Sequence, residues 1–428
     1  MKENQKTYWK GLEQLKNDPE FVKKSEGEFP EYLPINENEN GSSNRRDFLK
    51  MMGFGIAAAS LAACEAPVRK AIPYLNKPVD VDPSIPNYYA STYVNGGDAV
   101  SVVVKTREGR PIKIEGNKES AITHGGTNAQ TEASVLSLYD KERLKGPKKG
   151  EEAIEWLQMD NEIRVALSGS GQIRLVSNTV LSPTAKKAVG EFLTKFPNAQ
   201  HVAYDPVSAY GITEANRQSF GEAMIPSYDF SKAKTIVSIG ADFLGTWLSP
   251  IEFTKQYSKT RKINAEHREM SRHYQFESNL SLTGANADYR TPIKPSQAGA
   301  VVANLYNSIA GKAGQAGVSA SNPGDVANWQ QAANELWANR GSSLVVAGSN
   351  DPAIQVLVNG INAMLGNYGN TINTTAPMHA RQGNDQDMAT FVRELNGGSI
   401  DAVIFMNCNP VYEDDSINAS SVQFTNES

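Results

Sequence analysis

Cysteine is nearly absent from this chain. Its 428 residues include only Cys64 and Cys408, and Cys64 falls within a segment that resembles an export signal. The one remaining thiol cannot form a disulfide framework. A cysteine-ligated iron–sulfur cluster needs about four thiolates, and Cys-rich structural zinc sites need a similar set. The sequence therefore predicts that this chain holds neither kind of site.

Histidine is also scarce, and the chain has no excess of positive charge. No two of the five histidines have a spacing that places two metal ligands on one helix. Lysine and arginine number 42 against 47 aspartates and glutamates, which gives a net charge of −5. Because a nucleic-acid-binding surface needs a basic face, we expect no nucleic acid among the partners. The histidines are His124, His201, His267, His273 and His379.

The apolar stretch at residues 51–63 is too short to span a bilayer, which takes about 20 residues. It follows the pair Arg45-Arg46 and the segment Phe48-Leu49-Lys50, and it ends in small residues. This order is typical of a secretory signal, and the paired arginine indicates the twin-arginine route. Residues 44–64 are therefore predicted to direct export of the folded protein. A buried amphipathic helix with a chance arginine pair is the alternative.

The end of this signal, Leu61-Ala62-Ala63-Cys64, resembles a lipobox. It predicts that Cys64 carries a lipid and becomes the first residue of the mature protein. The alternative is a chance cysteine in an alanine-rich run. One lipid chain gives only marginal membrane binding, so stable attachment at the periplasmic side of the membrane would also need a partner.

Two polar segments flank the signal. Residues 1–43 form a leader with aromatic clusters, which is either a recognition handle for assembly or a disordered tail. Residues 65–92 are rich in proline and tyrosine. We expect this segment to be an extended arm on a partner's surface, with a solvated linker as the alternative.

Residues 93–150 are predicted to form a small β-rich domain. The apolar run 100–105, the turn Glu108-Gly109-Arg110 and the segment 111–116 form the pattern of a β-hairpin. A helical segment is expected at 131–140.

The rest of the chain alternates strand and helix patterns, which predicts an α/β fold with parallel sheets covered by helices. Two such blocks, 151–297 and 298–428, are expected, the second of them incomplete. Ligands of such sheets bind beyond the carboxyl ends of the strands. The predicted strands are 172–176, 201–204, 235–239, 273–276, 343–347 and 402–406, and the predicted helices are 183–196, 298–310 and 351–365.

Several segments resemble the molybdopterin oxidoreductase family, which includes formate dehydrogenase and periplasmic nitrate reductase. VVVKTREGRPIKIEGN and HGGTNAQTEASVLSLYDKERLKGP resemble its small first domain. SIGADFLGTWLSP (238–250) and SNLSLTGANADYRTPIKP (278–295) resemble its next domain, and FMNCNPVY (405–412) resembles a loop that approaches its dinucleotide. The resemblance implies Rossmann-like α/β domains.

The leader YWKGLEQL…DPEF…EFP ahead of a twin-arginine signal is a more specific feature. It resembles the iron–sulfur and molybdopterin-like subunits of alternative complex III, a menaquinol:cytochrome c oxidoreductase. This likeness implies a membrane respiratory complex. The implied partners are a multihaem cytochrome c, a quinol-binding membrane subunit and a ferredoxin-like domain that carries iron–sulfur clusters beyond this chain.

Three departures from the family affect function. The segments STYVNGG and HGGTNAQ lack the cysteines that hold the family's first cluster, and the cysteine-rich ferredoxin-like domain is not in this sequence. In the loop 177–183, where the family places its molybdenum ligand, only Ser177 or Ser182 could serve. A serine before proline at a helix start is more typical of a cap. We therefore expect no cofactor in this chain.

Weak candidates for cofactor binding remain at two turns. Gly240-Ala241-Asp242 follows a predicted strand and could face a phosphate, and Asn407 and Asn409 lie in the dinucleotide-like loop. The polar turn 381–384 is expected to be an ordinary loop.

Three functions are compatible with these features. The first is a non-catalytic scaffold in a quinol-oxidising complex. The second is an active molybdenum oxidoreductase with a serine ligand. The third is an exported lipoprotein that binds a small molecule.

Overall fold

The computed structural model describes residues 85–95, 98–169, 171–263 and 268–417, together with Pro19, Val79 and Asp82. The account below concerns the unit Lys77–Ser428. The predicted leader, the twin-arginine signal with Arg45, Arg46 and Cys64, and most of the predicted arm lie outside the described residues.

The first part of this unit is a three-stranded antiparallel sheet in the order β1-β2-β3. Val100 and Val102 of β2 are buried, with the residue between them half-buried, as expected of a sheet that covers a core on one face. The predicted hairpin is confirmed, and Glu108 and Gly109 turn the chain with positive φ angles of 51° and 75°. The strands are β1 (Asn87–Asn95), β2 (Asp98–Arg107) and β3 (Arg110–Gly116).

The last residues of the predicted arm belong to this sheet, which corrects the expectation for residues 87–92. Strand β1 pairs with β2 from Asn87 opposite Thr106 to Asn95 opposite Asp98. The prolines end at Pro86, and the tyrosines, threonine and valine that follow favour a strand. The described end of the arm therefore pairs within its own chain.

Short elements connect this sheet to the α/β part. Helix α4 begins after Asn128, whose side chain accepts a hydrogen bond from the backbone N–H of Thr131. Together with the 3₁₀ segment that follows, it matches the helical segment expected at 131–140. The elements are α4 (Ala129–Ala133), η1 (Ser134–Tyr139), β4 (Lys148–Lys149), β5 (Glu152–Ala153) and α5 (Trp156–Gly169).

A parallel sheet in the order β14-β6-β7 follows. All five residues of the central strand β6 are buried, because parallel strands are covered by helices on both faces. The elements of this layer are β6 (Ile173–Ser177), α6 (Pro183–Lys195), β7 (Ala199–Ala203), α13 (Asp385–Asn396), β14 (Ala402–Met406) and α14 (Pro410–Glu413).

A second parallel sheet has the order β11-β10-β9-β12, and an antiparallel pair β13-β8 accompanies it. Its strands are β8 (Ile225–Tyr228), β9 (Thr235–Ile239), β10 (Arg272–Glu277), β11 (Tyr289–Pro292), β12 (Ser343–Ala347) and β13 (Ile372–Met378). Its helices are α7 (Tyr210–Phe220), η2 (Phe230–Lys232), α8 (Pro250–Arg261), α9 (Leu282–Ala285), η3 (Pro295–Gln297), α10 (Ala298–Ala313), α11 (Trp329–Ala338) and α12 (Pro352–Met364).

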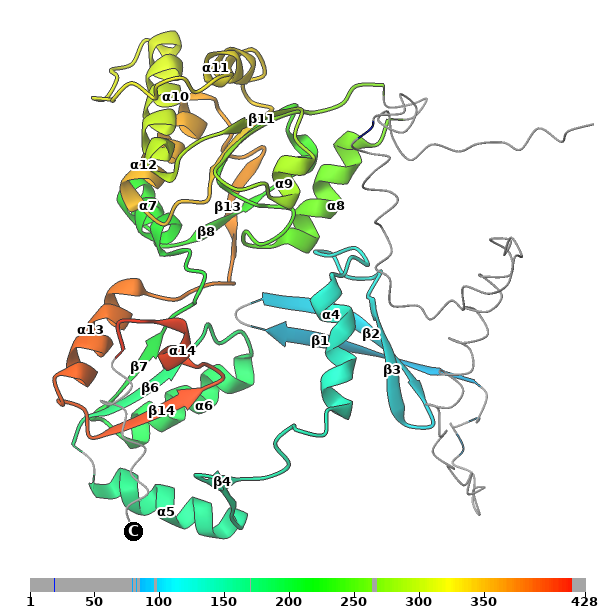
Figure 1. The fold of residues 1–428 in the computed structure, drawn as a ribbon, viewed down its shortest axis with the longest axis vertical. Helices are drawn as coiled ribbons and strands as arrows, with labels where there is room; N and C mark the ends of the chain where they lie inside the picture. The colour runs from blue at the N-terminus through cyan, green and yellow to red at the C-terminus, as the bar shows by residue number, and fades with distance from the viewer. Residues whose placement is uncertain are drawn as a thin grey trace, which may run out of the picture. The chain divides into compact units, whose positions relative to one another are not determined.

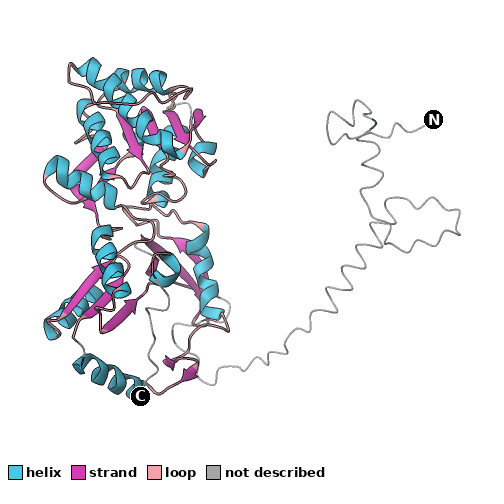
Figure 2. Cartoon of the chain, turned by 60° about the vertical axis from the view of Figure 1, so that its left-hand side comes forward, coloured by secondary structure: helices cyan, strands magenta, loops and turns pink. Residues whose placement is uncertain are grey.

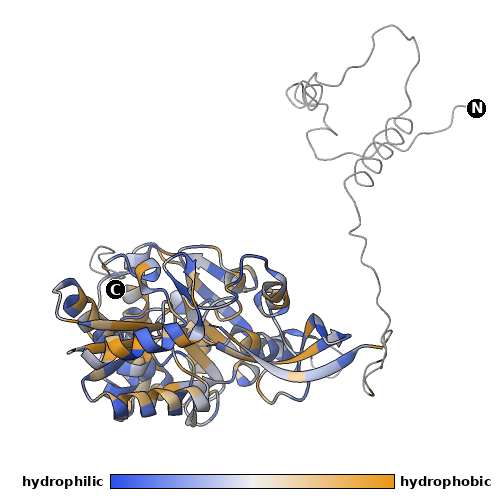
Figure 3. Ribbon diagram, turned by 90° about the horizontal axis from the view of Figure 1, so that it is seen from below, coloured by the Kyte–Doolittle hydropathy of each residue, from blue (hydrophilic) through white to orange (hydrophobic). Residues whose placement is uncertain are grey.

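The predicted α/β class with parallel sheets is confirmed by this strand pairing. Strands lie between helices throughout the α/β part (Figure 2). Apolar and polar segments alternate along the helices, as expected of elements that bury one face (Figure 3). None of the helices in the described ranges is long and apolar enough to cross a membrane.

The expected division at residue 297 does not separate the two sheets. Strand β9 precedes this position and β12 follows it, yet the two pair directly, and so do β6 and β14. In Figure 1 the orange and red segment from α13 to α14 joins the green strands β6 and β7. Alternating patterns predict parallel strands but not their order, so the expected blocks 151–297 and 298–428 are corrected. The segment from α7 to β13 is instead inserted between β7 and α13.

Candidate functional site

The carboxyl ends of β6, β7 and β14 meet at one edge of the first parallel sheet. The chain leaves β6 toward β7 on one side, whereas β14 pairs on the other side. The strand order therefore reverses between β6 and β14. Such a switch point is where open α/β sheets place their ligands, so this edge is the candidate site.

A buried carboxylate joins the loops at this edge. Asp205 follows β7 and is 4% exposed. It accepts hydrogen bonds from the backbone N–H of Thr179 at 3.1 Å, the Thr179 hydroxyl at 2.6 Å and the backbone N–H of Gly383 at 2.8 Å. The Thr179 hydroxyl oxygen in turn accepts from the backbone N–H of Gln382 at 2.6 Å. The backbone N–H groups of Thr179, Gln382 and Gly383, which could otherwise bind a ligand, therefore form hydrogen bonds within the protein.

The two serines of the family's metal-ligand loop have other partners. Ser177 is 1% exposed, and its hydroxyl lies 2.7 Å from the Asn178 carbonyl oxygen and 2.8 Å from Nε2 of His201. Burial lowers the pKa of His201. Ser182 caps α6 by accepting a hydrogen bond from the backbone N–H of Ala185 at 3.3 Å. Both hydroxyls therefore already have partners within the protein.

The loop after β14, which resembles the loop that approaches the family's dinucleotide, folds back onto its own sheet. Asn407 takes a left-handed φ of 54°, and Asn409 directly precedes α14. Between them, the Cys408 thiol donates to the Val176 carbonyl oxygen at 3.3 Å, and burial raises the pKa of this thiol. The loop therefore places a half-buried, protonated thiol next to β6.

The turn after β9 also serves packing. Gly240 has a φ of 69°, and its backbone lies against Gly348 after β12. The Asp242 carboxylate accepts from the backbone N–H of Thr283 at 3.0 Å and from its hydroxyl at 2.7 Å. The Thr283 hydroxyl oxygen accepts from the backbone N–H of Leu244 at 2.9 Å. Asp242 therefore fixes the start of α9 and would repel a phosphate.

A cavity of about 1050 Å³ lies beside β7, α13 and α14. Five of its described lining residues carry carboxylates, and among the lining residues that the structure describes Arg393 is the single cation. Tyr204 in its wall donates a hydrogen bond to the Glu413 carboxylate. The two phosphates of a pterin dinucleotide require cations or free N–H donors, so the residues here do not fit that group. The carboxylates belong to Asp205, Asp385, Glu413, Asp414 and Asp415.

The described residues also contain no cluster of three or more histidine, cysteine, aspartate or glutamate side chains that could hold a metal ion. His201 and His273, for example, lie on strands of different sheets.

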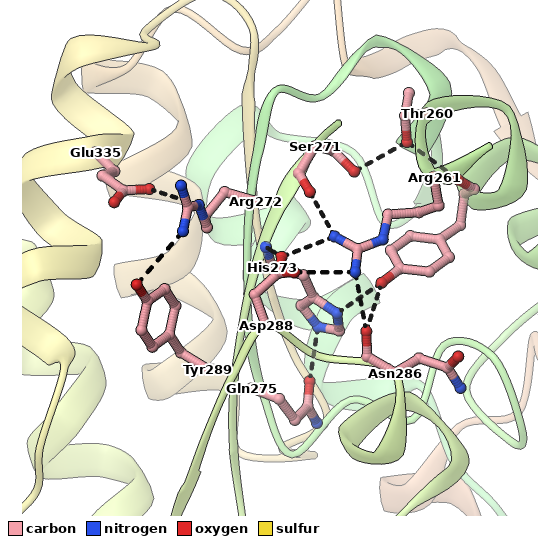
Figure 4. Close-up of polar contacts among 11 residues, drawn as sticks. Thr260, Arg261, Ser271, Arg272, His273, Gln275, Asn286, Asp288, Tyr289 and Glu335 are labelled. Atoms are coloured by element: carbon pink, nitrogen blue, oxygen red, sulfur yellow. Dashed lines mark hydrogen bonds and ion pairs between the residues drawn. The ribbon is translucent and has the colours of Figure 1, made fainter. Parts of the chain in front are cut away.

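A buried polar cluster surrounds His273 on β10 (Figure 4). Its ring lies 3.2 Å from the Tyr257 hydroxyl and 3.3 Å from Oε1 of Gln275. Its backbone N–H donates to Asp288 at 2.7 Å, and Arg261 pairs with the same carboxylate at 2.7 Å. Every group has a protein partner and the histidine is fully buried, so the cluster stabilises the fold.

This cluster predicts a pH dependence of stability. Burial lowers the pKa of His273 from 6.5 to about 4, so between these values the unfolded chain binds a proton that the folded chain does not. The stabilisation is complete above pH 6.5 and is lost as the pH falls toward 4. Between pH 7 and 5 the free energy of unfolding should fall by about 2 kcal/mol through this residue.

Urea unfolding at pH 7 and pH 5 measures the effect. His273→Gln should lower stability at pH 7 but reduce the loss between pH 7 and 5. The exposed His379 gives a control for the substitution itself, since His379→Gln should leave the stability at pH 7 nearly unchanged. An equal loss in His273→Gln and the unchanged chain would show that His273 is not the titrating group.

Comparisons with known proteins give a distant sequence likeness to a molybdopterin-binding-like subunit. No family model matches the chain. Over 230 residues, 52% of the chain, it is 25% identical to the "menaquinone reductase, molybdopterin-binding-like subunit" of Nitratidesulfovibrio vulgaris. The match spans 32% of that relative, so the chain corresponds to about a third of its length. This likeness supports the molybdopterin oxidoreductase resemblance, while the specific likeness to the alternative complex III subunit stays a prediction.

Solved structures give weaker likenesses. Acetylene hydratase from Pelobacter acetylenicus matches with a TM-score of 0.45 and 13% identity, covering 67% of this chain and 42% of that protein. A chain of the formyltransferase/hydrolase complex from Methylorubrum extorquens matches with a TM-score of 0.36 and 12% identity, covering 50% and 55%. Neither score reaches 0.5, and the α/β assignment rests on the strand pairing described above.

Proposed function

We propose that this chain is a non-catalytic, molybdopterin-oxidoreductase-like subunit of a membrane respiratory complex that exchanges electrons with quinone. The observation that carries the non-catalytic role is the carboxylate-lined cavity beside β7, α13 and α14. The family would hold its dinucleotide phosphates there, and five carboxylates with one arginine oppose them electrostatically. The chain serves as a scaffold that holds electron-transfer subunits together.

The link to a quinone-reacting complex draws on the relative named menaquinone reductase subunit. The leader and signal in the sequence favour a more specific assignment, a menaquinol:cytochrome c oxidoreductase of the alternative complex III type. In this proposal the chain itself carries no cofactor. The iron–sulfur clusters lie in a ferredoxin-like part, and the other partners are a multihaem cytochrome c and a quinol-binding membrane subunit.

The proposed location is the periplasmic side of the cytoplasmic membrane. Arg45 and Arg46 direct export, and Cys64 carries a lipid anchor. One lipid chain alone binds marginally, so a contact with a membrane subunit supplies the second attachment. The proline-rich segment 65–84, which precedes β1, is the part of the chain that we assign to this contact.

Purification from native membranes tests the proposal. The tagged full chain, extracted in mild detergent, should be recovered with a haem-absorbing subunit and a membrane-spanning subunit. Deleting residues 65–84 should release the chain from the complex while the unfolding transition of the α/β part is retained, because β1 stays intact. The double change Arg45→Lys with Arg46→Lys is the control for export and should prevent assembly. Recovery of the unchanged chain alone, without haem absorbance, would contradict the assembly.

An active molybdenum oxidoreductase has less support. It would require Ser177 or Ser182 as the metal ligand, and both hydroxyls already have partners in the protein. An exported small-molecule-binding lipoprotein is favoured by one specific observation, a cavity separate from the carboxylate-lined edge.

A further inference from the structure

Strand β1 is an open edge of the antiparallel sheet. In the order β1-β2-β3 it has β2 as its only neighbour among the described strands. Within the described part of the chain, the backbone of residues 88–94 pairs with β2 alone. In an edge strand, alternate backbone N–H and C=O groups point away from the sheet and can pair with a further strand. The backbone of β1 therefore offers a row of hydrogen-bonding groups to another chain.

Edge strands of soluble proteins are usually protected against such pairing by lysine, proline, bulges or short length. Strand β1 has none of these features: it is nine residues long, its sequence NYYASTYVN has no charged residue or proline, and its pairing with β2 is continuous. The other edge, β3, carries Pro111 and Lys113, and its pairing with β2 shifts register between Lys105 and Thr106. Of the two edges, β1 is thus the one that can accept a strand.

Side chains on both faces of β1 are open to contact. Successive side chains of a strand point to opposite faces of the sheet, so Tyr88 and Tyr89 lie on opposite faces. Their exposed fractions are 54% and 56%, and every residue from 88 to 92 is exposed. A partner strand beside β1 could therefore contact it through side chains on both faces.

The sequence of β1 is close to a palindrome, which makes the strand complementary to itself. In an antiparallel pair of two β1 strands centred on Ser91, tyrosines lie opposite aromatic or β-branched residues, and such cross-strand pairs stabilise a sheet. The order of residues therefore favours a second copy of the same chain, bound antiparallel. The pairs on either side of Ser91 are Ala90 with Thr92, Tyr89 with Tyr93 and Tyr88 with Val94.

Charge favours the same arrangement. Like charges directly opposite each other destabilise a sheet, and β1 has no charged side chain. Cations of β2 lie near one end of β1, where Lys105 is opposite Tyr88 and Arg107 follows. Antiparallel pairing of two copies places these cations at opposite ends of the joined sheet, whereas parallel pairing would place them side by side.

We propose that this chain forms a dimer in which β1 pairs with β1 of a second copy about a two-fold axis at Ser91. The two three-stranded sheets then become one continuous six-stranded antiparallel sheet. Because one strand pair is small beside a permanent dimer interface, we expect a reversible dimer with a Kd of about 10 µM. The inference goes beyond the proposed function, and it holds or fails on the chain by itself.

Disulfide trapping in the full chain tests the register. In the proposed dimer the two copies of residue 91 lie directly opposite, with Cβ atoms about 5 Å apart, so Ser91→Cys should give a covalent dimer under mild oxidation. Val94 is also exposed, but it would lie opposite residue 88 of the other copy, so its two copies are about 20 Å apart along the strand. Val94→Cys is therefore the matched control and should stay monomeric on a non-reducing gel. The unchanged chain gives the background from Cys64 and Cys408.

Sedimentation equilibrium of the full chain tests the contact without a covalent bond. The unchanged chain should pass from monomer to dimer between about 1 and about 100 µM. Ser91→Lys and Ser91→Glu each place like charges opposite each other, so each variant alone should associate about tenfold more weakly, and an equimolar mixture of the two should restore association. Because residue 91 is exposed, both variants should keep the melting temperature of the unchanged chain.

The inference is overturned if the unchanged chain stays monomeric up to about 100 µM, or if Val94→Cys is trapped as readily as Ser91→Cys. It is also overturned if the mixture of Ser91→Lys and Ser91→Glu associates no more tightly than either variant alone. A monomer that binds a strand of another subunit at β1 would contradict it as well.

Discussion

Replacing Asp205 with alanine should lower the free energy of unfolding by about 3–5 kcal/mol, the largest loss that we expect from a single side chain. The carboxylate accepts three hydrogen bonds from Thr179 and Gly383, which lie in loops far apart in the sequence. Its removal leaves these donors buried without acceptors. The loops after β6 and β7 and the segment before α13 would lose their common attachment.

Urea unfolding at neutral pH measures this loss. Asp160 offers a matched control because it is exposed on α5, and Asp160→Ala should change stability by less than about 0.5 kcal/mol. Asp205→Asn keeps one acceptor oxygen but points an amide at N–H donors, so it should also destabilise the fold. A loss under about 1 kcal/mol for Asp205→Ala would show that the network contributes little.

A single methyl group at Gly348 should cost about 3 kcal/mol of stability. A Cβ at this position would lie 2.7 Å from the carbonyl carbon of Gly240 and 3.0 Å from the backbone nitrogen of Ala241. Both are backbone atoms of the turn after β9, which cannot rotate away as a side chain can. Gly348→Ala must therefore push apart the ends of two paired strands.

Gly190 provides the opposite case. It lies exposed within α6, and a methyl group added to it would meet no atom within 4 Å beyond the backbone of its own helix. Gly190→Ala should raise stability by up to about 1 kcal/mol, because alanine favours the helix over glycine. Thermal melts of both variants should move in opposite directions. Equal and small shifts would mean that the turns after β9 and β12 are not closely packed.

The strands were predictable wherever the sequence is locally unambiguous. The segments 235–239, 343–347 and 402–406 were expected as strands and coincide with β9, β12 and β14. Short apolar runs bounded by polar turns indicate buried strands without any knowledge of their neighbours. Pro183 and Ser182 likewise indicated the start of α6.

The site was less predictable because its contacts join distant segments. Asp205 and Gly383 are separated by 178 positions, and no local pattern indicates that they meet. The segment 381–384 was expected to be an ordinary loop, yet it supplies two of the donors around Thr179 and Asp205. The strand order that brings β14 beside β6 is a tertiary property, so the carboxylates of that edge could not be grouped from their spacing.

Elemental analysis of the chain for molybdenum and iron tests the central proposal most directly. The chain should be produced with its export signal in a host that synthesises molybdopterin cofactors, and separated from haem-containing subunits before measurement. The proposed scaffold, with its carboxylate-lined edge and a single thiol outside the signal segment, predicts that neither metal exceeds background. Molybdenum in stoichiometric amount, bound to the folded chain, would contradict the account and favour a working oxidoreductase.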